Sequence, residues 1–302
     1  MAATVNPGTE VDSPGFESNV REILHISDIH FGPHHLPDVA DGVVALAERR
    51  RPDLVVISGD LTHRAKPQQF QDARRYIDRF TVPTLAVPGN HDVPMYRVWE
   101  RVLAPYGAYR KHFDGDMEPE WEDDTLAVIG VNTAFNWTVK DGRITRQRLR
   151  QLDERLAQVP ESKSILIVAH HQLVPPPRFD AQRVITNAFE AADVFTRHGV
   201  DMVLSGHLHQ CWIGSTEAYY PTARDPVLLV HSGTTTTIRG RGVERRRNTC
   251  NWIRVDEGSL EISHLRWEEP DKAFFELSRH RFPRRRRITS TVSRPHVLGE
   301  AF

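Results

Sequence analysis

The sequence predicts an α/β fold in which strands and helices alternate up to about residue 210. Short apolar runs typical of buried strands are separated by segments whose apolar residues recur at helical spacing. Beyond residue 210 the helical spacing stops and only β-type runs follow. The alternation indicates a layered fold with parallel pairing in its first half, and the later runs indicate an antiparallel meander.

Each predicted element has its own signal in the sequence. Strands are expected at runs rich in Val, Ile and Leu, which cover residues 21–27, 53–58, 84–88, 125–132, 164–170 and 201–205. Helices are expected where apolar residues follow helical spacing, at residues 36–50, 67–80, 96–113, 145–159 and 186–199. The connection 114–124 is rich in turn residues. The late strands are expected at residues 226–233, 249–256 and 260–267, and a short Glu-Gly turn joins the last two.

One main domain is expected, covering residues 21–278. Residues 1–20 are rich in Gly, Pro, Ser and Thr and lack periodicity, which predicts a disordered lead-in. Residues 279–302 begin with a run of arginines and are expected to form a basic, flexible tail. No internal repeat is present, and no linker is long enough to separate two domains.

The composition is typical of a soluble globular protein, with 39% hydrophobic and 8% aromatic residues. No apolar run is long enough to cross a bilayer, and the first residues lack a basic start followed by an apolar core. We therefore expect a cytoplasmic protein without a membrane span, in which Cys211 and Cys250 are reduced.

The formal net charge of −1 conceals an uneven layout. Arginines are concentrated in residues 239–247 and 279–287, and acidic residues outnumber basic ones elsewhere. These segments could contact nucleic acid or an anionic membrane, or simply be solvated. An acidic body does not indicate the broad basic groove of a nuclease, so nucleic acid is a possible but not a favoured partner. The oligomeric state is not indicated.

Polar residues follow five of the predicted strands. These residues are Asp28 and His30; Asp60; Asn90, His91 and Asp92; His170 and His171; and His207 and His209. The loops at the carboxyl ends of strands converge in α/β sheets, and ligands bind there. In an extended backbone, residues at positions i and i+2 point the same way, so each D-x-H or H-x-H pair could face one centre.

The residue types indicate a metal centre. Nitrogen and oxygen donors without a thiolate suit Mn, Fe or Zn. Seven candidate ligands exceed the needs of one ion and suit two ions that share one carboxylate. Taken singly, a D-x-H is often a helix cap and a G-D is often a turn. Their joint occurrence at five strand ends makes these explanations weak.

These motifs resemble the calcineurin-like metallophosphoesterase superfamily, whose ordered signature is D-x-H, G-D, G-N-H-[DE], a later His and G-H-x-H. Here they read SDIH, SGDLT, PGNHD, VAHH and SGHLH. The segments HISDIHFG, GDLT and VPGNHD are similar to its cyclic-nucleotide-phosphodiesterase-like branch. The resemblance implies a four-layer α/β/β/α sandwich of two mostly mixed sheets flanked by helices.

The resemblance also implies roles for individual residues. The first metal ion would be held by Asp28, His30 and His209, the second by Asn90, His170 and His207, and Asp60 would bridge both. Either His170 or His171 fits the fourth motif. We choose His170 because it directly follows the strand, where the backbone is best fixed.

The implied function is that of a dinuclear-metal phosphohydrolase, with a cyclic nucleotide or another small phosphodiester as substrate. Hydroxide held between the ions would attack the phosphorus. His91 would face the substrate and bind a phosphoryl oxygen or donate a proton, and Asp92 would orient His91 and raise its pKa. The alternatives are a metal-dependent nuclease and, less favoured because no ligand is missing, a non-catalytic scaffold on the same fold.

Three other features are each open to two interpretations. Aromatic residues at 93–120, among them Tyr96 and Trp99, could stack a base over the site or pack against each other. The hydroxyls and arginines of residues 234–242 could contact a phosphate or form a solvated loop. His63 could reach the mouth of the site or lie on the surface, and we do not count it among the site residues.

Overall fold

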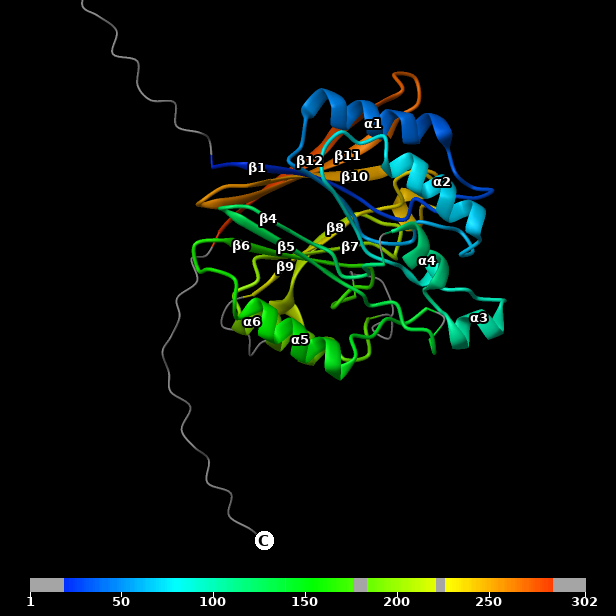
Figure 1. Ribbon diagram of the computed structural model, residues 1–302. Coiled ribbons are helices and arrows are strands. Elements are labelled where there is room, and N and C mark those ends of the chain that lie inside the picture. Colours follow the sequence, from blue (N-terminus) through cyan, green and yellow to red (C-terminus); the bar gives the residue numbers. More distant parts are fainter. Residues whose placement is uncertain (1–18, 114, 139, 176–183, 221–225, 285–302) are drawn as a thin grey trace, which may run out of the picture.

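The computed structural model describes residues 19–113, 115–138, 140–175, 184–220 and 226–284. Two six-stranded sheets lie face to face. Figure 1 shows α1 (Pro37–Arg50) and α2 (Pro67–Ile77) over one sheet and α5 (Arg146–Leu156) and α6 (Ala188–Arg197) over the other. The predicted four-layer α/β/β/α sandwich is therefore confirmed. The predicted lead-in and tail lie largely outside the described residues.

The first sheet combines the amino-terminal strands with the carboxyl-terminal meander. Its order is β12-β11-β10-β1-β2-β3. The parallel part consists of β1 (Arg21–Ile26), β2 (Leu54–Ile57) and β3 (Thr84–Ala86). The antiparallel part consists of β10 (Thr249–Val255), β11 (Ser259–Glu268) and β12 (Ala273–Pro283). Both the parallel first half and the late meander agree with the sequence prediction.

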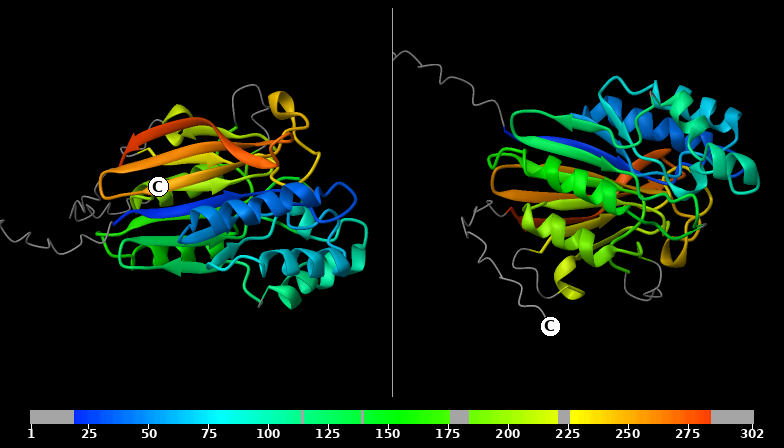
Figure 2. Two further views of the ribbon diagram at one scale, coloured as in Figure 1. Left: turned by 90° about the horizontal axis from the view of Figure 1, so that it is seen from above. Right: turned by 60° about the horizontal axis from the view of Figure 1, so that its bottom comes forward.

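The second sheet is built from the middle of the chain, in the order β4-β5-β6-β7-β9-β8. Its parallel strands are β5 (Leu126–Val131), β6 (Ser164–Ala169), β7 (Met202–Ser205) and β9 (Leu228–His231). Two short antiparallel strands, β4 (Glu120–Glu122) and β8 (Trp212–Ser215), form its edges. Figure 2 shows both sheets and their covering helices from two further sides.

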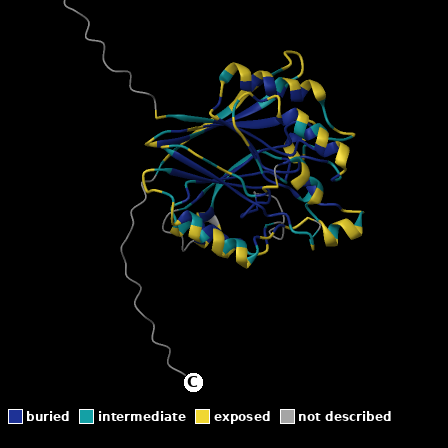
Figure 3. Ribbon diagram, viewed as in Figure 1, coloured by how far each residue is buried: buried dark blue, intermediate teal, exposed yellow. Residues whose placement is uncertain are grey.

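Three apolar cores hold the four layers together. On β2, Leu54 and Val56 face the core between the sheets, while Val55 and Ile57 face the core under α1 and α2. The strands of the second sheet likewise share their residues between the inter-sheet core and a core under α5 and α6. Because alternate residues of a strand point to opposite faces, a strand buried on both faces must be apolar throughout. Figure 3 shows the buried strands between the partly exposed helices.

The structure corrects several predicted boundaries. The single helix expected at 96–113 is two short helices, α3 (Val98–Leu103) and α4 (Gly107–His112). Pro105 separates them, because proline has no N–H group for a helical hydrogen bond. The connection at 114–124 contains β4, and the chain after residue 210 contains β8, neither of which was predicted.

The predicted domain end at residue 278 lies inside a strand. β12 pairs with β11 along its length, from Ala273 opposite Glu268 to Pro283 opposite Ser259. Most of its side chains are at least partly exposed and several are charged, so it lacks the apolar run that marks the inner strands. Arg279, assigned to the tail, instead pairs with Glu276 at 2.7 Å and lies 3.6 Å from Glu261.

Among the described residues, no helix is both long enough and apolar enough to span a bilayer.

Candidate metal centre

The predicted ligands meet where the carboxyl ends of the parallel strands of both sheets come together. Backbone hydrogen bonds tie the loops to one another there: Asp28 N–H donates to Gly59 O at 3.1 Å and His30 N–H to Asp60 O at 2.9 Å. Gly206 N–H donates to His170 O at 3.1 Å. Loops that follow β1, β2, β6 and β7 are thus fixed against their neighbours.

The backbone is strained at five of the seven predicted ligands. Positive φ angles occur at Asp28 (53°), His30 (40°), Asp60 (53°), His207 (70°) and His209 (56°). Residues other than glycine rarely adopt this conformation, and such outliers cluster at functional sites. The surrounding hydrogen bonds hold these side chains in directions that relaxed loops would not give them.

Gly89 allows the closest approach between two of the loops. A Cβ atom at this position would lie 2.2 Å from Asp60 Oδ1 and 2.3 Å from the Asp60 backbone nitrogen. No side chain fits at such distances. The glycine of the predicted G-N-H-D motif therefore leaves room for Asp60 to approach, in addition to forming its own turn.

One group of donors consists of Asp28, His30, Asp60 and His209. All are buried, and their ligand atoms lie within 4.8 Å of one another. His209 Nε2 lies 3.0 Å from Asp28 Oδ1, and His30 Nε2 lies 3.5 Å from the same oxygen and 3.6 Å from Asp60 Oδ2. Asp28 Oδ1 has no hydrogen-bond donor among the described residues, although the atom is buried.

The tautomers of the histidines explain why no donor reaches this oxygen. The Nδ1 atoms of three histidines each lie against a backbone carbonyl: His30 against Thr62 (3.2 Å), His170 against Ser58 (2.8 Å) and His209 against Arg239 (2.8 Å). A neutral imidazole that donates from Nδ1 carries a lone pair on Nε2. Lone pairs of His30 and His209 therefore face each other at 3.2 Å, an arrangement that a cation between them stabilises.

A second group lies beside the first. His207 Nδ1 lies 2.9 Å from Asn90 Oδ1, and His170 Nε2 lies 3.2 Å from the same oxygen. Asp60 Oδ1 lies 3.4 Å from His170 Nε2, whereas its other oxygen faces His30. Asp60 thus offers one carboxylate oxygen to each group, an arrangement that suits a ligand shared by two ions.

The protonation states fit cation binding. Burial lowers the pKa of His30 and of His207 to about 3, which keeps both rings neutral. Burial raises the pKa of Asp60, but His170 and His91 outweigh it and hold that pKa well below its usual range. Burial lowers the pKa of His170, yet Asp60 raises it to about 9, so a cation would have to displace a proton there. These residues fit a pair of divalent cations.

The profile of the calcineurin-like phosphoesterase family matches residues 21–211. The chain belongs to this family.

Two sequence relatives agree with this assignment. A probable cyclic nucleotide phosphodiesterase of Synechococcus sp. is 31% identical over 177 residues, which cover 58% of this chain and 64% of that protein. The 3′,5′-cyclic adenosine monophosphate phosphodiesterase CpdA of Escherichia coli is 29% identical over 209 residues, covering 64% and 71% of the two chains. The match thus spans just under two thirds of the Synechococcus protein.

The fold is shared with more distant proteins. Purple acid phosphatase PPD1 from seeds of yellow lupin (Lupinus luteus) aligns with a TM-score of 0.68 at 12% identity, over 88% of this chain and 54% of that one. At this identity the similarity concerns the fold alone.

The two adjacent histidines, His170 and His171, have different surroundings. His170 faces Asn90 and Asp60, whereas His171 Nδ1 lies 2.8 Å from Thr133 Oγ1. The His171 ring nevertheless lies 4.6 Å from the His207 ring, and His171 could join His170 and His207 around an ion. The contacts to Asn90 and Asp60 favour His170 as the ligand.

The contacts of Asp92 favour a role other than the predicted one. Its carboxylate accepts hydrogen bonds from the backbone N–H groups of Leu61 (3.0 Å), Thr62 (2.8 Å) and Gly89 (2.9 Å) and from the Thr62 hydroxyl (2.9 Å). His91 is oriented instead by the His63 carbonyl, which lies 2.8 Å from His91 Nδ1. Burial and the nearby Asp60 raise the pKa of Asp92 to about 7. Through these hydrogen bonds Asp92 fastens two loops together.

We expect Asp92→Ala to destabilise the fold by about 3 kcal/mol, because it leaves three buried N–H groups without an acceptor. Thermal unfolding measures this loss of stability. Asp92→Asn keeps one acceptor oxygen, so its melting temperature should lie between those of Asp92→Ala and the wild type. An unchanged melting temperature together with a shifted pH profile of turnover would restore the first interpretation, in which Asp92 acts on His91.

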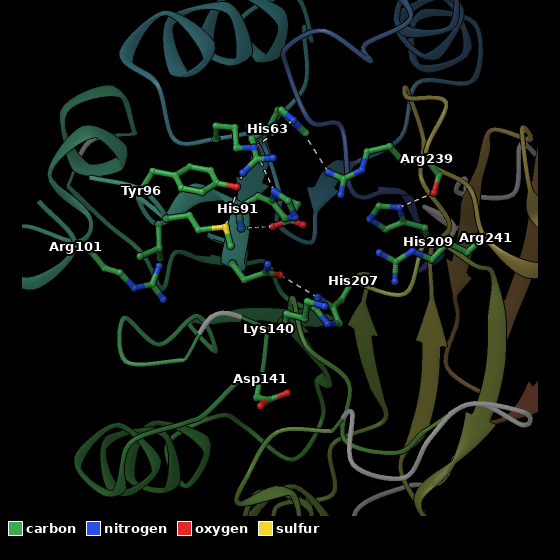
Figure 4. A pocket seen from close by; sticks show the side chains of 15 residues that line it. His63, His91, Tyr96, Arg101, Lys140, Asp141, His207, His209, Arg239 and Arg241 are labelled. Carbon is green, nitrogen blue, oxygen red and sulfur yellow. Dashed lines mark hydrogen bonds between the residues drawn. The ribbon is translucent and has the colours of Figure 1, made fainter. Parts of the chain in front are cut away.

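A pocket of about 360 Å³ opens onto the donors, and Figure 4 shows its lining. Arg64, Arg101 and Lys140 line it without having been predicted, whereas the sequence left the roles of His63, Tyr96, Arg239 and Arg241 open and all four also line it. Arg64, Arg101 and Lys140 come from segments that carry no metal-binding motif, so no sequence signal indicated them. Tyr106 and Tyr109 pack inward, donating to Ala134 O at 2.5 Å and Ala86 O at 2.9 Å.

Proposed function

We propose that this phosphoesterase hydrolyses small phosphodiesters, cyclic nucleotides first among them, with two metal ions drawn from Mn, Fe and Zn. The observation that carries the proposal is the position of Asp60, whose two oxygens face separate donor groups at the base of one pocket. The names of the relatives from Synechococcus and Escherichia coli support the choice of cyclic nucleotides.

The metal ions, once bound, would supply charge neutralisation at the phosphoryl group and lower the pKa of a water molecule. The protein holds its ligands rigid for this task, because strained backbone and carbonyl-bound histidines leave them little freedom. Asn90 contributes a neutral oxygen, which adds no further negative charge to a site that must accept an anion.

His91 is placed to handle a proton. Its ring packs edge-on against the His30 ring, at 4.8 Å between centroids, and its Nδ1 is engaged by the His63 carbonyl. His91 Nε2 is then the atom left to face substrate in the pocket, where an imidazolium would protonate the leaving oxygen.

The size and charge of the pocket suit a small anion. Its volume of about 360 Å³ lies near the lower end of the range for small-molecule sites. Arg64, Arg101, Lys140, Arg239 and Arg241 line it, against the carboxylates of Asp60 and Asp141. A confined cationic pocket accommodates one nucleotide better than a duplex, which supports the phosphodiesterase over the nuclease.

Tyr96 offers a platform for a base at the rim of the pocket. Its side chain is 69% exposed, and the Arg64 guanidinium lies 4.7 Å from the centre of its ring. Stacking of a base on an aromatic ring is worth about 1–3 kcal/mol. We expect Tyr96→Ala to raise the KM for 3′,5′-cyclic AMP by about 5- to 100-fold, and Tyr96→Phe to preserve it. An unchanged KM in Tyr96→Ala would exclude this platform.

The proposed function is tested with protein purified in the presence of Mn²⁺. Hydrolysis of bis-p-nitrophenyl phosphate, 3′,5′-cyclic AMP and single-stranded DNA is compared, with metal content measured in parallel. We expect turnover of the first two substrates. Activity on the DNA alone would establish the nuclease instead. No turnover of any substrate by protein that carries both ions would contradict the proposal and favour the scaffold.

A further inference from the structure

We infer that the Arg239 guanidinium forms a binding subsite for a phosphoryl oxygen, beside the donor group that contains His30. This inference deepens the proposed function and rests on it. Arg239 lies outside residues 21–211, the part of the chain that matches the family profile. The subsite would take the anionic oxygen of a phosphate ester or of inorganic phosphate.

The guanidinium lies at the mouth of the metal centre. Arg239 NH1 is 3.3 Å from His30 Nδ1, 3.4 Å from His30 Nε2 and 3.4 Å from His63 Nδ1. Its nearly equal distances to both nitrogens of the His30 ring indicate contact with the ring rather than a hydrogen bond to one atom. Figure 4 shows Arg239 on the same side of the pocket as His209, with His63 next to it.

Arg239 has no carboxylate of a described residue in contact with its guanidinium, and Asp60 and Asp28 act on its charge only from beyond 4.0 Å. Among the described residues, no carboxylate lies within 4.0 Å of its guanidinium, whereas Arg97 pairs with Glu100 at 2.7 Å. Both nitrogens of the His30 ring are already committed, Nδ1 to the Thr62 carbonyl and Nε2 to the donor group. A partly buried cation without a partner is costly, and an anionic ligand in the pocket would offset that cost.

The segment that carries Arg239 is fixed to the metal-binding loop. Thr234 and Thr236 donate from their hydroxyls to the carbonyls of Asp28 (2.9 Å) and Ile29 (3.0 Å), and Thr235 N–H donates to Ser27 O (3.0 Å). All three threonines are fully buried. The guanidinium is therefore positioned before a ligand arrives, which reduces the ordering cost of binding. The sequence left open whether the hydroxyls and arginines of residues 234–242 contact a phosphate or form a solvated loop. In the structure the threonine hydroxyls bind backbone carbonyls, and Arg239 faces the pocket.

The backbone and the side chain of Arg239 have separate tasks. The carbonyl lies 2.8 Å from His209 Nδ1 and orients that ring, and Arg241 N–H donates to the His209 carbonyl at 3.2 Å. A side-chain substitution leaves both bonds available. Loss of phosphate binding can thus be separated from loss of a metal ligand.

Arginine suits this position for chemical reasons. Its planar fork of N–H groups matches the geometry of a phosphoryl group and donates charge-assisted hydrogen bonds. A lysine would keep the charge but not the fork. The neighbouring His63 remains neutral, since burial and then Arg239 itself lower the pKa of His63 to about 4, so His63 does not compete for the anion.

The test measures binding of inorganic phosphate to Mn²⁺-loaded protein by titration calorimetry, with metal content determined on the same samples. We expect Arg239→Gln to weaken phosphate binding by about 10- to 100-fold, the effect of losing a charged hydrogen bond, with unchanged metal content. The phosphate affinity of Arg239→Lys should lie between those of the wild type and Arg239→Gln. Arg245→Gln, an exposed arginine of the same segment that is not among the pocket-lining residues, is the matched control and should bind phosphate like the wild type.

Two outcomes would overturn the inference: equal phosphate affinity in wild type and Arg239→Gln, or a loss of metal that accounts for the weaker binding. Because calorimetry needs no turnover, the phosphate subsite and the proposed function can be refuted independently of each other. Weakened binding in Arg239→Gln by a protein that hydrolyses none of the tested esters would support the subsite and contradict the phosphodiesterase.

Discussion

Replacement of Asp60 by alanine is expected to remove both metal ions from the protein and to lower turnover by more than about 10³-fold. The reason is geometric. Asp60 Oδ2 lies 3.6 Å from His30 Nε2 and Asp60 Oδ1 lies 3.4 Å from His170 Nε2, so one side chain serves both donor groups. Without it, each ion would lose a ligand and the pair would lose the anion that separates two positive charges.

Elemental analysis of protein loaded with Mn²⁺ and then desalted measures the metal, and hydrolysis of bis-p-nitrophenyl phosphate measures turnover. Asp78→Ala is the matched control, because Asp78 is an exposed aspartate that pairs with Arg74 at the end of α2. The control should retain metal and activity. If Asp60→Ala retained both ions, the bridging role would be refuted, even if turnover fell.

The layers of the fold could be predicted from the sequence because they depend on local signals. Strands such as β2 and β6 are buried on both faces and therefore form continuous apolar runs, which are difficult to mistake. β12 escaped prediction because its stability depends on pairing with β11, which lies next to it in space. Its own side chains are mostly exposed and carry no apolar pattern.

That the residues of the two donor groups lie together could be predicted for a related reason: each follows a strand whose direction is fixed, so a short motif determines where the side chain lies. The lining of the pocket could not, because it depends on how distant loops pack. Arg239 is brought to His30 by threonine hydroxyls that bind the 28–29 backbone, contacts that no spacing in the sequence reveals. Asp92 shows the converse difficulty: adjacency to His91 suggested a contact between the two side chains, whereas the Asp92 carboxylate accepts from the Thr62 backbone and His91 Nδ1 lies against the His63 carbonyl.

We expect His91→Ala to retain both ions and to lose about 10²- to 10⁴-fold in turnover of 3′,5′-cyclic AMP. His91 is not one of the predicted ligands of either donor group. Its ring lines the pocket and lies with His30 and His63 in a further cluster whose nitrogen atoms are within 4.8 Å of one another. The leaving group separates the two roles open to His91. The ribose oxygen of cyclic AMP leaves as a basic alkoxide and needs a proton, whereas p-nitrophenolate is stable without one.

A proton donor therefore predicts a selective defect, with cyclic AMP hydrolysis impaired strongly and hydrolysis of bis-p-nitrophenyl phosphate by less than about 10-fold. A residue that only binds the phosphoryl oxygen predicts equal losses on both esters, because that oxygen is present in each. His280→Ala, at an exposed histidine of β12, controls for the loss of an imidazole and should behave like the wild type. Wild-type turnover of cyclic AMP by His91→Ala would exclude both roles and leave the half-buried ring as packing between His30 and His63.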